Sequence, residues 1–181
     1  LLHRLGYDGF ADIIREYDLI CPMGEQMYVP VREHYARAPH HRVADLERME
    51  QILYQMHSKY RCSAHTYLDG TVHYFGNLYI FSRAQFERYC QWLFPMLAEF
   101  DRQTDLTGYS PQERRVDGYL AERLFGIYLT YLQQNESLRI LKLPRVHFEG
   151  MGGKDYRMKK LIAAGFPAGS RRRAYLKRIF T

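Results

Sequence analysis

The most informative segment of the sequence runs from Thr71 to Tyr131. It begins TVHYFGNLYIFSRAQFERYCQWLFPMLAEFD at residues 71–101 and ends SPQERRVDGYLAERLFGIYLTY at residues 110–131. The pattern predicts one strand followed by two long helices. Residues Val72 to Phe81 are rich in aromatic and β-branched types and too apolar for an exposed edge, so we expect a buried strand there.

Gly76 and Asn77 interrupt the predicted strand. A glycine inside a strand usually marks a bulge or a close approach by another group. Asn77 offers two donors and an acceptor at that point. Two interpretations stay open: a bulge whose Asn side chain satisfies the local backbone, or a point at which a ligand approaches the strand.

The first long helix has a well-marked predicted start. Ser82 is the expected N-cap, and Gln85 three residues later completes a capping box. Phe81 and Phe86 occupy the two positions of a hydrophobic staple, and Pro95 should kink the helix. The expected apolar stripe consists of Phe86, Tyr89, Leu93, Leu97 and Phe100.

The second long helix repeats this start. Ser110 is the expected N-cap, Pro111 takes the first helical position, and Glu113 completes a capping box. The expected apolar stripe consists of Val116, Leu120, Leu124, Ile127 and Tyr131.

A second stripe on this helix holds Arg115, Gly118, Tyr119, Glu122 and Gly126. At about 100° per residue it lies roughly opposite the apolar stripe. Each internal glycine costs about 1 kcal/mol relative to alanine, so two on one face need a reason. One interpretation is close approach by a ligand or another backbone, with Arg115 and Glu122 flanking the gap. The other is a solvated face with an ordinary charge pair.

The rest of the chain predicts shorter elements around this centre. We expect helices at residues 7–16, 31–38 and 43–60, and strands at residues 17–21 and 138–148. Pro22 would stop the first of these strands and Pro144 would break the second. Residues 61–70 are expected to form an irregular connector.

Length and cysteine content limit the class of protein. The chain has 181 residues, enough for one domain with a real core. Its three cysteines are odd in number and widely spaced, which fits neither a disulfide framework nor a metal signature and favours a reducing cytoplasm. It does not open with Met, has no signal peptide and has no apolar run long enough to span a bilayer. We expect a soluble protein whose sequence starts inside a longer one.

Positive charge is concentrated at the C-terminal end. Residues 154–181 contain nine Lys or Arg and one acidic residue, a net charge of +8. The whole chain carries +6, so residues 1–153 sum to −2. Residues 171–180 mix basic and apolar side chains, a pattern that suits an anionic membrane surface, nucleic-acid phosphates or a disordered tail.

Several familiar catalytic signatures are absent from the sequence. It has no phosphate-loop pattern, no Gly-x-Ser-x-Gly, no HExxH, no paired CxxC, and no Asp-x-Asp to hold a divalent metal. His40 and His41 precede a helix that carries Asp45. Such groups at a helix entrance suit a substrate phosphate or a sugar hydroxyl, or are simply surface histidines. Adjacent histidines point in different directions, so at most one should serve a site.

Five segments together carry a family resemblance. They are YDLICP (17–22), YARAPHHRVADLERMEQIL (35–53), HYFGNLYIFSRAQFERYCQWLFPML (73–97), RRVDGYLAERLFGIYL (114–129) and LKLPRV (141–146). In this order they resemble a family of bacterial glycosyltransferases from capsule and O-antigen gene clusters, first catalogued as a domain of unknown function. The resemblance covers roughly residues 8–148. Its most specific parts are the Gly76-Asn77 strand with the following Cys90-x-Trp92 helix, and the helix around Glu122.

The resemblance implies a helix-rich α/β fold of the GT-A type, with a mixed, mainly parallel sheet flanked by helices. It implies that residues 1–150 form the C-terminal portion of such a domain, because the family's first nucleotide-binding strands and acidic metal ligands have no counterpart here. Residues 151–181 would be a basic tail forming a membrane-surface helix.

The activity implied is that of a hexosyltransferase. It would move a sugar, a form of galactose, from a UDP-sugar to a lipid-linked surface polysaccharide. Glu122 would be the catalytic base or would hold a sugar hydroxyl. The implied substrate-binding residues are Tyr35, His41, Asp45, Gly76, Asn77, Arg115, Gly118, Tyr119 and Arg123.

The expected cofactor is Mn²⁺ or Mg²⁺, with ligands that this sequence does not identify. The expected location is cytoplasmic, peripheral on the inner face of the cell membrane, through contact of the basic tail with anionic lipid. Nucleic acid is not an expected partner. The alternative is a non-catalytic module that keeps the fold and binds a glycan or a membrane.

Overall fold

The computed structural model describes residues 7–145, with side chains from residue 11 onward. The expected basic tail, residues 151–181, lies outside the described residues. The elements in chain order are α1 (Tyr7–Glu16), β1 (Leu19–Pro22), β2 (Glu25–Gln26), α2 (Val31–Arg37), α3 (Val43–Met56), the 3₁₀ helix η2 (Ser58–Tyr60), α4 (Arg61–Leu68), β3 (Val72–His73), β4 (Ile80–Phe81), α5 (Arg83–Gln103), the 3₁₀ helix η3 (Glu113–Arg115), α6 (Val116–Asn135) and β5 (Ile140–Leu143). The chain is therefore α/β and rich in helix, as expected.

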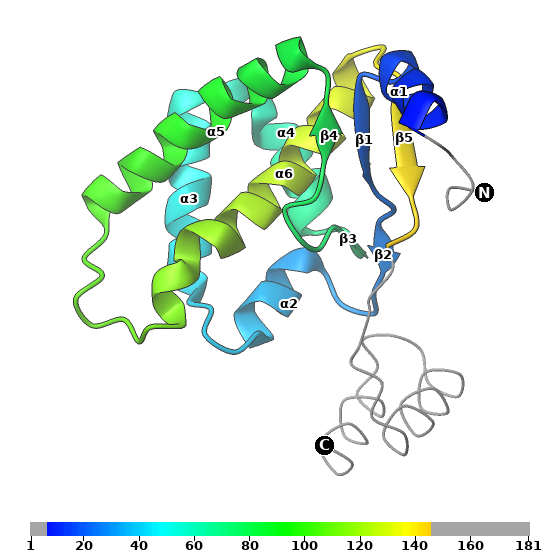
Figure 1. The fold of residues 1–181 in the computed structure, drawn as a ribbon. Helices are drawn as coiled ribbons and strands as arrows, with labels where there is room; N and C mark the ends of the chain where they lie inside the picture. The colour runs from blue at the N-terminus through cyan, green and yellow to red at the C-terminus, as the bar shows by residue number, and fades with distance from the viewer. Residues whose placement is uncertain (1–6, 146–181) are drawn as a thin grey trace.

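The strands form a small mixed sheet and a separate two-stranded ribbon. The order in the sheet is β4-β1-β5, with β1 antiparallel to β4 and parallel to β5. In the ribbon, β2 pairs antiparallel with β3. Among the described strands this sheet has one parallel and one antiparallel pair, whereas we expected a mainly parallel sheet. Helices α2–α6 all lie to one side of the sheet (Figure 1).

The predicted strand over Val72–Phe81 is wrong as a single buried element. Only its two ends are strands, and they belong to different sheets: β3 pairs with β2, and β4 with β1. Gly76 between them has φ +78°, a left-handed conformation that turns the chain and is accessible mainly to glycine. Val72 and Ile80 are 42% and 40% exposed. β-propensity and apolar content did not reveal this turn.

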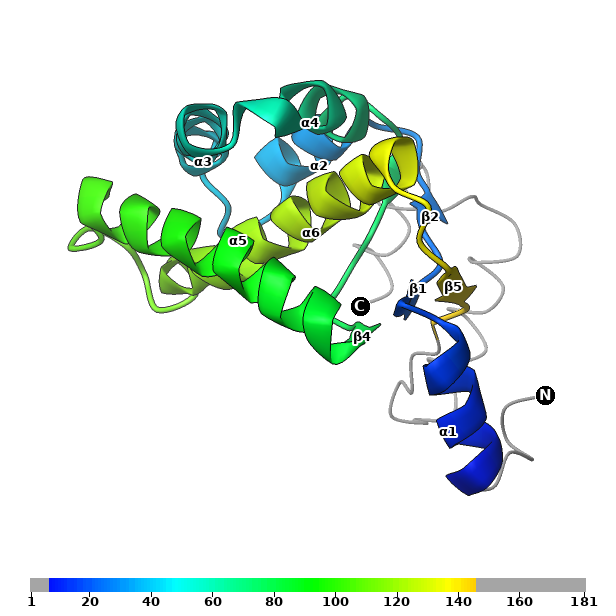
Figure 2. The same ribbon diagram turned by 90° about the horizontal axis from the view of Figure 1, so that it is seen from above.

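Helix α6 occupies the centre of the helical layer. Seen from above, it lies between α5 on one side and α2 and α4 on the other (Figure 2). Its predicted capping box forms, since Glu113 N–H donates to Ser110 Oγ at 3.3 Å and Ser110 N–H donates to Glu113 Oε2 at 2.8 Å, but the predicted first helical position at Pro111 is wrong. The turn after the capping box is the 3₁₀ helix η3, so α6 itself begins at Val116.

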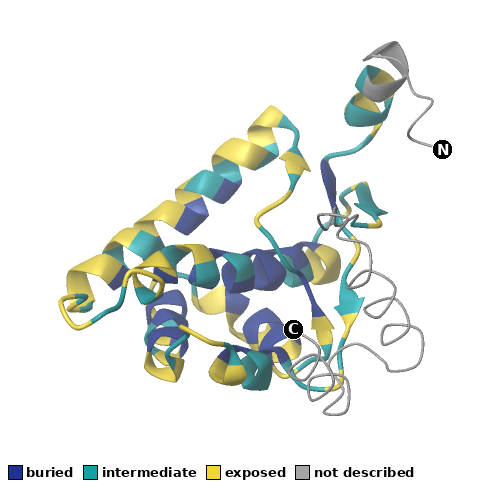
Figure 3. Ribbon diagram, turned by 60° about the horizontal axis from the view of Figure 1, so that its bottom comes forward, coloured by how far each residue is buried: buried dark blue, intermediate teal, exposed yellow. Residues whose placement is uncertain are grey.

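The predicted apolar stripe of α6 faces the core. Val116, Leu120, Leu124 and Ile127 are buried, and Tyr131 packs against the same core while partly exposed. In the second stripe, Arg115 and Gly118 are exposed and only Gly126 is buried, although the neighbouring Arg123 and Phe125 are buried as well. Figure 3 shows that the helical layer is most deeply buried at its centre, and in α6 residues 123–129 are all buried while both ends include exposed residues.

Helix α5 begins as predicted and buries three residues of its expected stripe, Tyr89, Leu93 and Phe100. Gln85 N–H donates to Ser82 Oγ at 3.5 Å, and the helix continues through Pro95. Phe86, the first residue of the expected stripe, is 51% exposed. The buried face consists of Tyr89, Trp92, Leu93, Met96 and Phe100.

Two predicted boundaries in the first half of the chain are corrected. The helix expected over residues 43–60 ends as α3 at Met56, and η2 follows it. Residues 61–70, expected to be irregular, form helix α4, which packs along α6 and buries Tyr67 and Leu68. Burial against α6 stabilises this short segment, which has no capping side chain.

Candidate functional site

The turn at Gly76 and Asn77 lies against the glycine-containing side of α6. Gly76 N–H donates to Glu122 Oε1 at 3.0 Å, and Asn77 Nδ2 donates to the Gly118 carbonyl at 3.2 Å. The loop at residues 76–77 and one turn of α6 are thus in contact, although they lie more than 40 residues apart in the chain. Asn77 is exposed and Glu122 is partly exposed, so both side chains of the junction reach the protein surface.

This junction lies near the carboxyl end of the sheet's parallel pair. Arg145 lies two residues after the end of β5, and its Nη1 donates to the Phe75 carbonyl at 3.4 Å, next to Gly76. In α/β folds, ligands bind outside the carboxyl ends of the parallel strands. The Gly76–Glu122 junction therefore occupies a position where binding sites usually form.

Glu122 is held in place by two donors. Oε1 accepts from Gly76 N–H, and Oε2 accepts from Arg123 Nη1 at 2.9 Å. Each carboxylate oxygen has a second lone-pair site, and the side chain is 23% exposed. Glu122 can therefore accept a hydrogen bond from a ligand hydroxyl while it keeps both protein contacts.

Arg123 is buried, so it supports Glu122 from inside the protein. The residue is 3% exposed, and its guanidinium carbon lies 5.5 Å from the ring centre of Tyr35. Its Nε has no hydrogen-bond partner among the described residues. Burial raises the pKa of Tyr35, so its phenol stays neutral beside this guanidinium. Tyr35 and Arg123 thus pack on the buried side of Glu122.

His41 and Tyr119 form an aromatic pair beside Tyr35. Their ring centres are 4.0 Å apart and stacked, and Tyr35 meets His41 edge-on at 4.6 Å. The Pro39 carbonyl lies 2.9 Å from His41 Nδ1. Burial lowers the pKa of His41, and the charge of Arg123 lowers it further, although the contact with Pro39 opposes both. In a neutral His41, Nδ1–H donates to the Pro39 carbonyl, so Nε2 can only accept a hydrogen bond and the ring brings no positive charge.

The two glycines of the polar stripe have different surroundings. A Cβ built on Gly126 would lie 2.0 Å from Cζ of Tyr67, so this glycine lets α4 and α6 pack closely. A Cβ on Gly118 would meet no protein atom within 4 Å. Gly118 therefore borders open space, next to Asn77 and one turn before Glu122.

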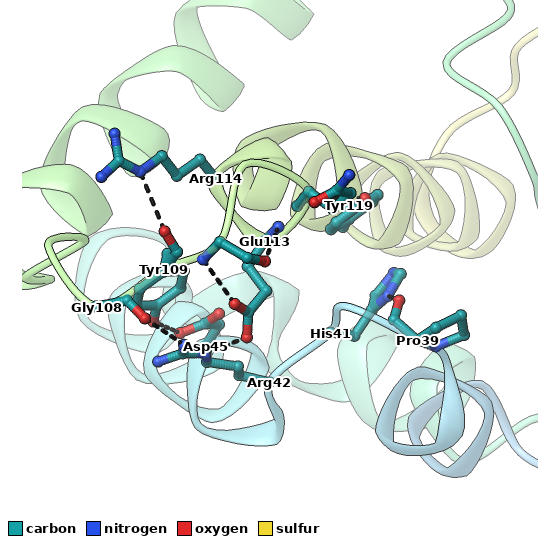
Figure 4. A network of polar contacts seen from close by, with 11 residues as sticks. Pro39, His41, Arg42, Asp45, Gly108, Tyr109, Glu113, Arg114 and Tyr119 are labelled. Atoms are coloured by element: carbon teal, nitrogen blue, oxygen red, sulfur yellow. Dashed lines mark hydrogen bonds and ion pairs between the residues drawn. The ribbon is translucent and has the colours of Figure 1, made fainter.

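Asp45 belongs to a neighbouring network that Figure 4 shows. It is buried, and its Oδ1 accepts from the Tyr109 hydroxyl at 2.7 Å. Arg42 lies over the Tyr109 ring at 3.7 Å and donates to Glu113 at 2.8 Å. Burial raises the pKa of Asp45, although the Tyr109 bond opposes this. Asp45 thus holds the loop before α6 and is directed at Tyr109 rather than at Glu122.

Arg115 stands at the N-terminal end of the polar stripe. Its side chain is exposed, and its guanidinium carbon lies 5.9 Å from the ring centre of Tyr119. No described residue forms a salt bridge with it. Arg115 is thus a solvent-facing cation near the open space over Gly118.

Sequence reasoning missed two histidines on the far side of Arg123. The His34 and His73 rings meet edge-on at 5.0 Å, and His73 Nε2 lies 2.9 Å from the Val29 carbonyl. Burial lowers the pKa of His34 to about 4, helped by the nearby charges of His73 and Arg123. Neither histidine lies at a spacing that signals a site. Only the fold brings α2 and β3 to the same part of α6.

An apolar groove of about 360 Å³ lies on the other side of the Gly76 turn. Its walls come from the ends of β1 and β5 and from residues 78–80. Arg145 is the one charged residue lining it within the described part of the chain.

Two further searches cover residues 7–145 only. Within that range no three His, Cys, Asp or Glu side chains cluster in a way that would hold a metal ion. None of the helices within it combines the length and the apolar character that a membrane crossing needs.

Comparison with known proteins gives one structural match and one family match. The apo structure of the bifunctional glycosyltransferase WbbM superimposes with a TM-score of 0.72 and 26% sequence identity, over 76% of this chain and 25% of that one. The present chain thus spans about a quarter of the protein it resembles. No curated protein matches. The model of the family described as "Domain of unknown function (DUF4422)" matches residues 3–135, and the chain belongs to this family.

Proposed function

We propose that this protein is a glycosyltransferase that moves a form of galactose from a UDP-sugar to a lipid-linked surface polysaccharide. The observation that carries the proposal is the junction of Glu122 with Gly76 and Asn77 on the exposed side of α6. The resemblance to part of WbbM supports sugar transfer as the reaction class. Donor sugar and acceptor rest on the sequence resemblance alone.

Glu122 is the proposed catalytic group. As general base it would take the proton of the acceptor hydroxyl. For this, a Glu122 carboxylate oxygen must lie within about 3 Å of the hydroxyl oxygen. As a sugar anchor it would accept a hydrogen bond from a donor hydroxyl instead. Arg123 fixes the carboxylate through the 2.9 Å contact, so Glu122 meets a ligand in one orientation.

The surrounding residues would bind the two substrates. The Asn77 amide can donate to a sugar hydroxyl and accept from one, because it is exposed beside Gly118. Arg115 would face a phosphate group. The His41–Tyr119 pair would bound the sugar on one side. Tyr35 and Asp45 would act indirectly, because both are buried.

The GT-A resemblance also raises Mn²⁺ or Mg²⁺ as a cofactor. Such ions take several oxygen ligands, mostly carboxylates and phosphates. The described residues do not supply a set of this kind near Glu122. The described residues therefore do not fit such an ion, and every role above belongs to a residue of this chain.

Membrane association is proposed on sequence grounds. Residues 154–181 carry a net charge of +8, and each cation adds about 1 kcal/mol near anionic headgroups. The protein should then sediment with vesicles containing phosphatidylserine, and a form ending at residue 153 should not. Equal sedimentation of the two forms would remove this part of the proposal.

Replacement of Glu122 with Gln tests the catalytic role. The amide keeps one oxygen to accept the Gly76 N–H, but the buried Arg123 loses its charged partner, so a thermal melt of the variant accompanies the assay and only transfer by folded protein is compared. Sugar transfer should fall by about 10² to 10⁴, the range that one acid–base group contributes. Glu87→Gln is the matched control, because Glu87 is an exposed carboxylate on α5 paired with Arg83.

The assay uses the full-length protein with UDP-galactose in pyranose and furanose forms, with and without Mn²⁺. Near-normal turnover of Glu122→Gln would remove Glu122 from the mechanism. Glycan or vesicle binding by the unaltered protein, without transfer or donor hydrolysis under any condition, would favour the alternative of a non-catalytic binding module.

A further inference from the structure

Gly118 has no structural reason to be glycine. Its φ is not positive, so the backbone does not require it. A Cβ would meet no protein atom within 4 Å, so packing does not require it. The bond from Asn77 uses the Gly118 carbonyl, which every residue has. Glycine is also a poor helix former compared with alanine.

The chemical character of the groups around Gly118 changes along α6, from a cation to bare backbone to a carboxylate. Arg115, Gly118 and Glu122 lie within about 100° of one another around the helix. From Arg115 to Glu122 the helix rises about 10 Å. An exposed cation thus stands at one end, bare backbone lies in the middle, and a fixed carboxylate stands at the other end. Asn77 borders the bare backbone from the facing loop.

This order of groups matches the chemistry of a sugar phosphate. A phosphate pairs with a guanidinium, and sugar hydroxyls donate to a carboxylate and to an amide oxygen. A sugar ring between them has room to lie against the helix backbone, because Gly118 carries no side chain and a Cβ there would meet nothing within 4 Å. The spacing of about 10 Å suits one ring with one attached phosphate better than an elongated peptide or a lipid chain.

We propose that Gly118 is a specificity-determining residue, on which the ring of the transferred sugar lies, with its phosphate toward Arg115 and its hydroxyls toward Glu122 and Asn77. This inference rests on the proposed function and adds the orientation of the donor. It also gives the two glycines of the stripe different roles. The Tyr67 ring packs against Gly126, whereas the sugar would lie on Gly118.

The test compares stability with binding in a Gly118→Ala variant. Because alanine favours the helix and meets no protein atom, the melting temperature should stay equal or rise by about 2 °C. A methyl group under the sugar ring should weaken binding of UDP-galactose at least about tenfold, since small misplacements at a site are costly. Binding of UDP alone should change less than about threefold. Isothermal titration of the full-length protein measures both.

Two matched variants complete the design. Gly108→Ala also places a methyl group in open space, but in the loop before α6, and should leave both affinities unchanged. Arg115→Gln should weaken UDP and UDP-galactose together, because it removes a phosphate contact.

The inference is overturned if Gly118→Ala binds UDP-galactose as tightly as the unaltered protein, or if it weakens UDP equally. If Glu122→Gln is inactive at the same time, the proposed function stands without this orientation. If the unaltered protein binds neither nucleotide, both fail together.

Discussion

Replacing Gly126 with alanine should destabilise the protein, although alanine is the better helix former. The new Cβ would lie 2.0, 2.4 and 2.5 Å from three ring atoms of Tyr67. The shortest of these falls about 1.5 Å short of an ordinary carbon contact of about 3.5 Å. The Tyr67 ring cannot swing away freely, because it is buried and its hydroxyl accepts from the Tyr74 N–H at 3.4 Å.

The size of the effect follows from two opposing contributions. Overpacking of a close-packed core costs about 1–3 kcal/mol, and an overlap this deep belongs at the upper end. Helix propensity returns about 1 kcal/mol. The net loss should be about 2 kcal/mol, a fall in melting temperature of about 4–8 °C for a chain of this size. Urea unfolding followed by circular dichroism measures the free energy directly.

A second substitution identifies the cause. In a Tyr67→Ala background the ring is gone, so Gly126→Ala should become neutral or stabilising by up to about 1 kcal/mol. If Gly126→Ala alone is as stable as the unaltered protein, the close approach of α4 to α6 is not what the structure indicates. If the loss persists without the Tyr67 ring, its cause lies elsewhere on α6.

Three further predictions concern stability and pH. Burial would raise the pKa of Glu50, but hydrogen bonds from Arg32 and Tyr54 outweigh burial and lower it. The ionised Glu50 therefore stabilises the fold fully above about pH 4.5, and this stabilisation is lost as the pH falls further. Glu50→Gln should therefore cost about 2 kcal/mol at pH 7, with a smaller difference at pH 3, in thermal melts; an equal loss at both pH values would contradict this. Burial lowers the pKa of His34 to about 4, below that of an unfolded histidine, so stability should fall as the pH drops from about 6.5 to 4; His34→Gln should flatten this slope and the exposed His65→Gln should not. Gly76→Ala should cost about 1–2 kcal/mol because its φ of +78° is strained for alanine, and a neutral result would mean that the turn relaxes without glycine.

The long helices could be predicted because their sequences carry local signals. Ser110 and Glu113 form the reciprocal cap that their spacing predicts, and the apolar stripe of α6 is buried where its period places it. Helix α4 carries no such signal. It has no capping side chain, and its stability comes from packing Tyr67 against Gly126 on a distant helix. Contacts of that range cannot be inferred from periodicity.

The candidate site was predictable in part. The structure brings together Glu122, Gly76, Asn77 and Gly118, and the role of these residues in binding a sugar stays a prediction. The pattern treated Gly118 and Gly126 alike, because helical spacing cannot tell a packed glycine from an open one. His34 was missed because its neighbour His73 is 39 residues away and becomes adjacent only in the fold.

The decisive measurement is a structure of the full-length protein with a UDP-sugar bound. We predict a sugar hydroxyl within about 3.2 Å of a Glu122 carboxylate oxygen and another within that distance of the Asn77 amide, with the ring over Gly118. A sugar bound elsewhere, for instance in the apolar groove beside Arg145, with Glu122 contacting only Gly76 and Arg123, would contradict it.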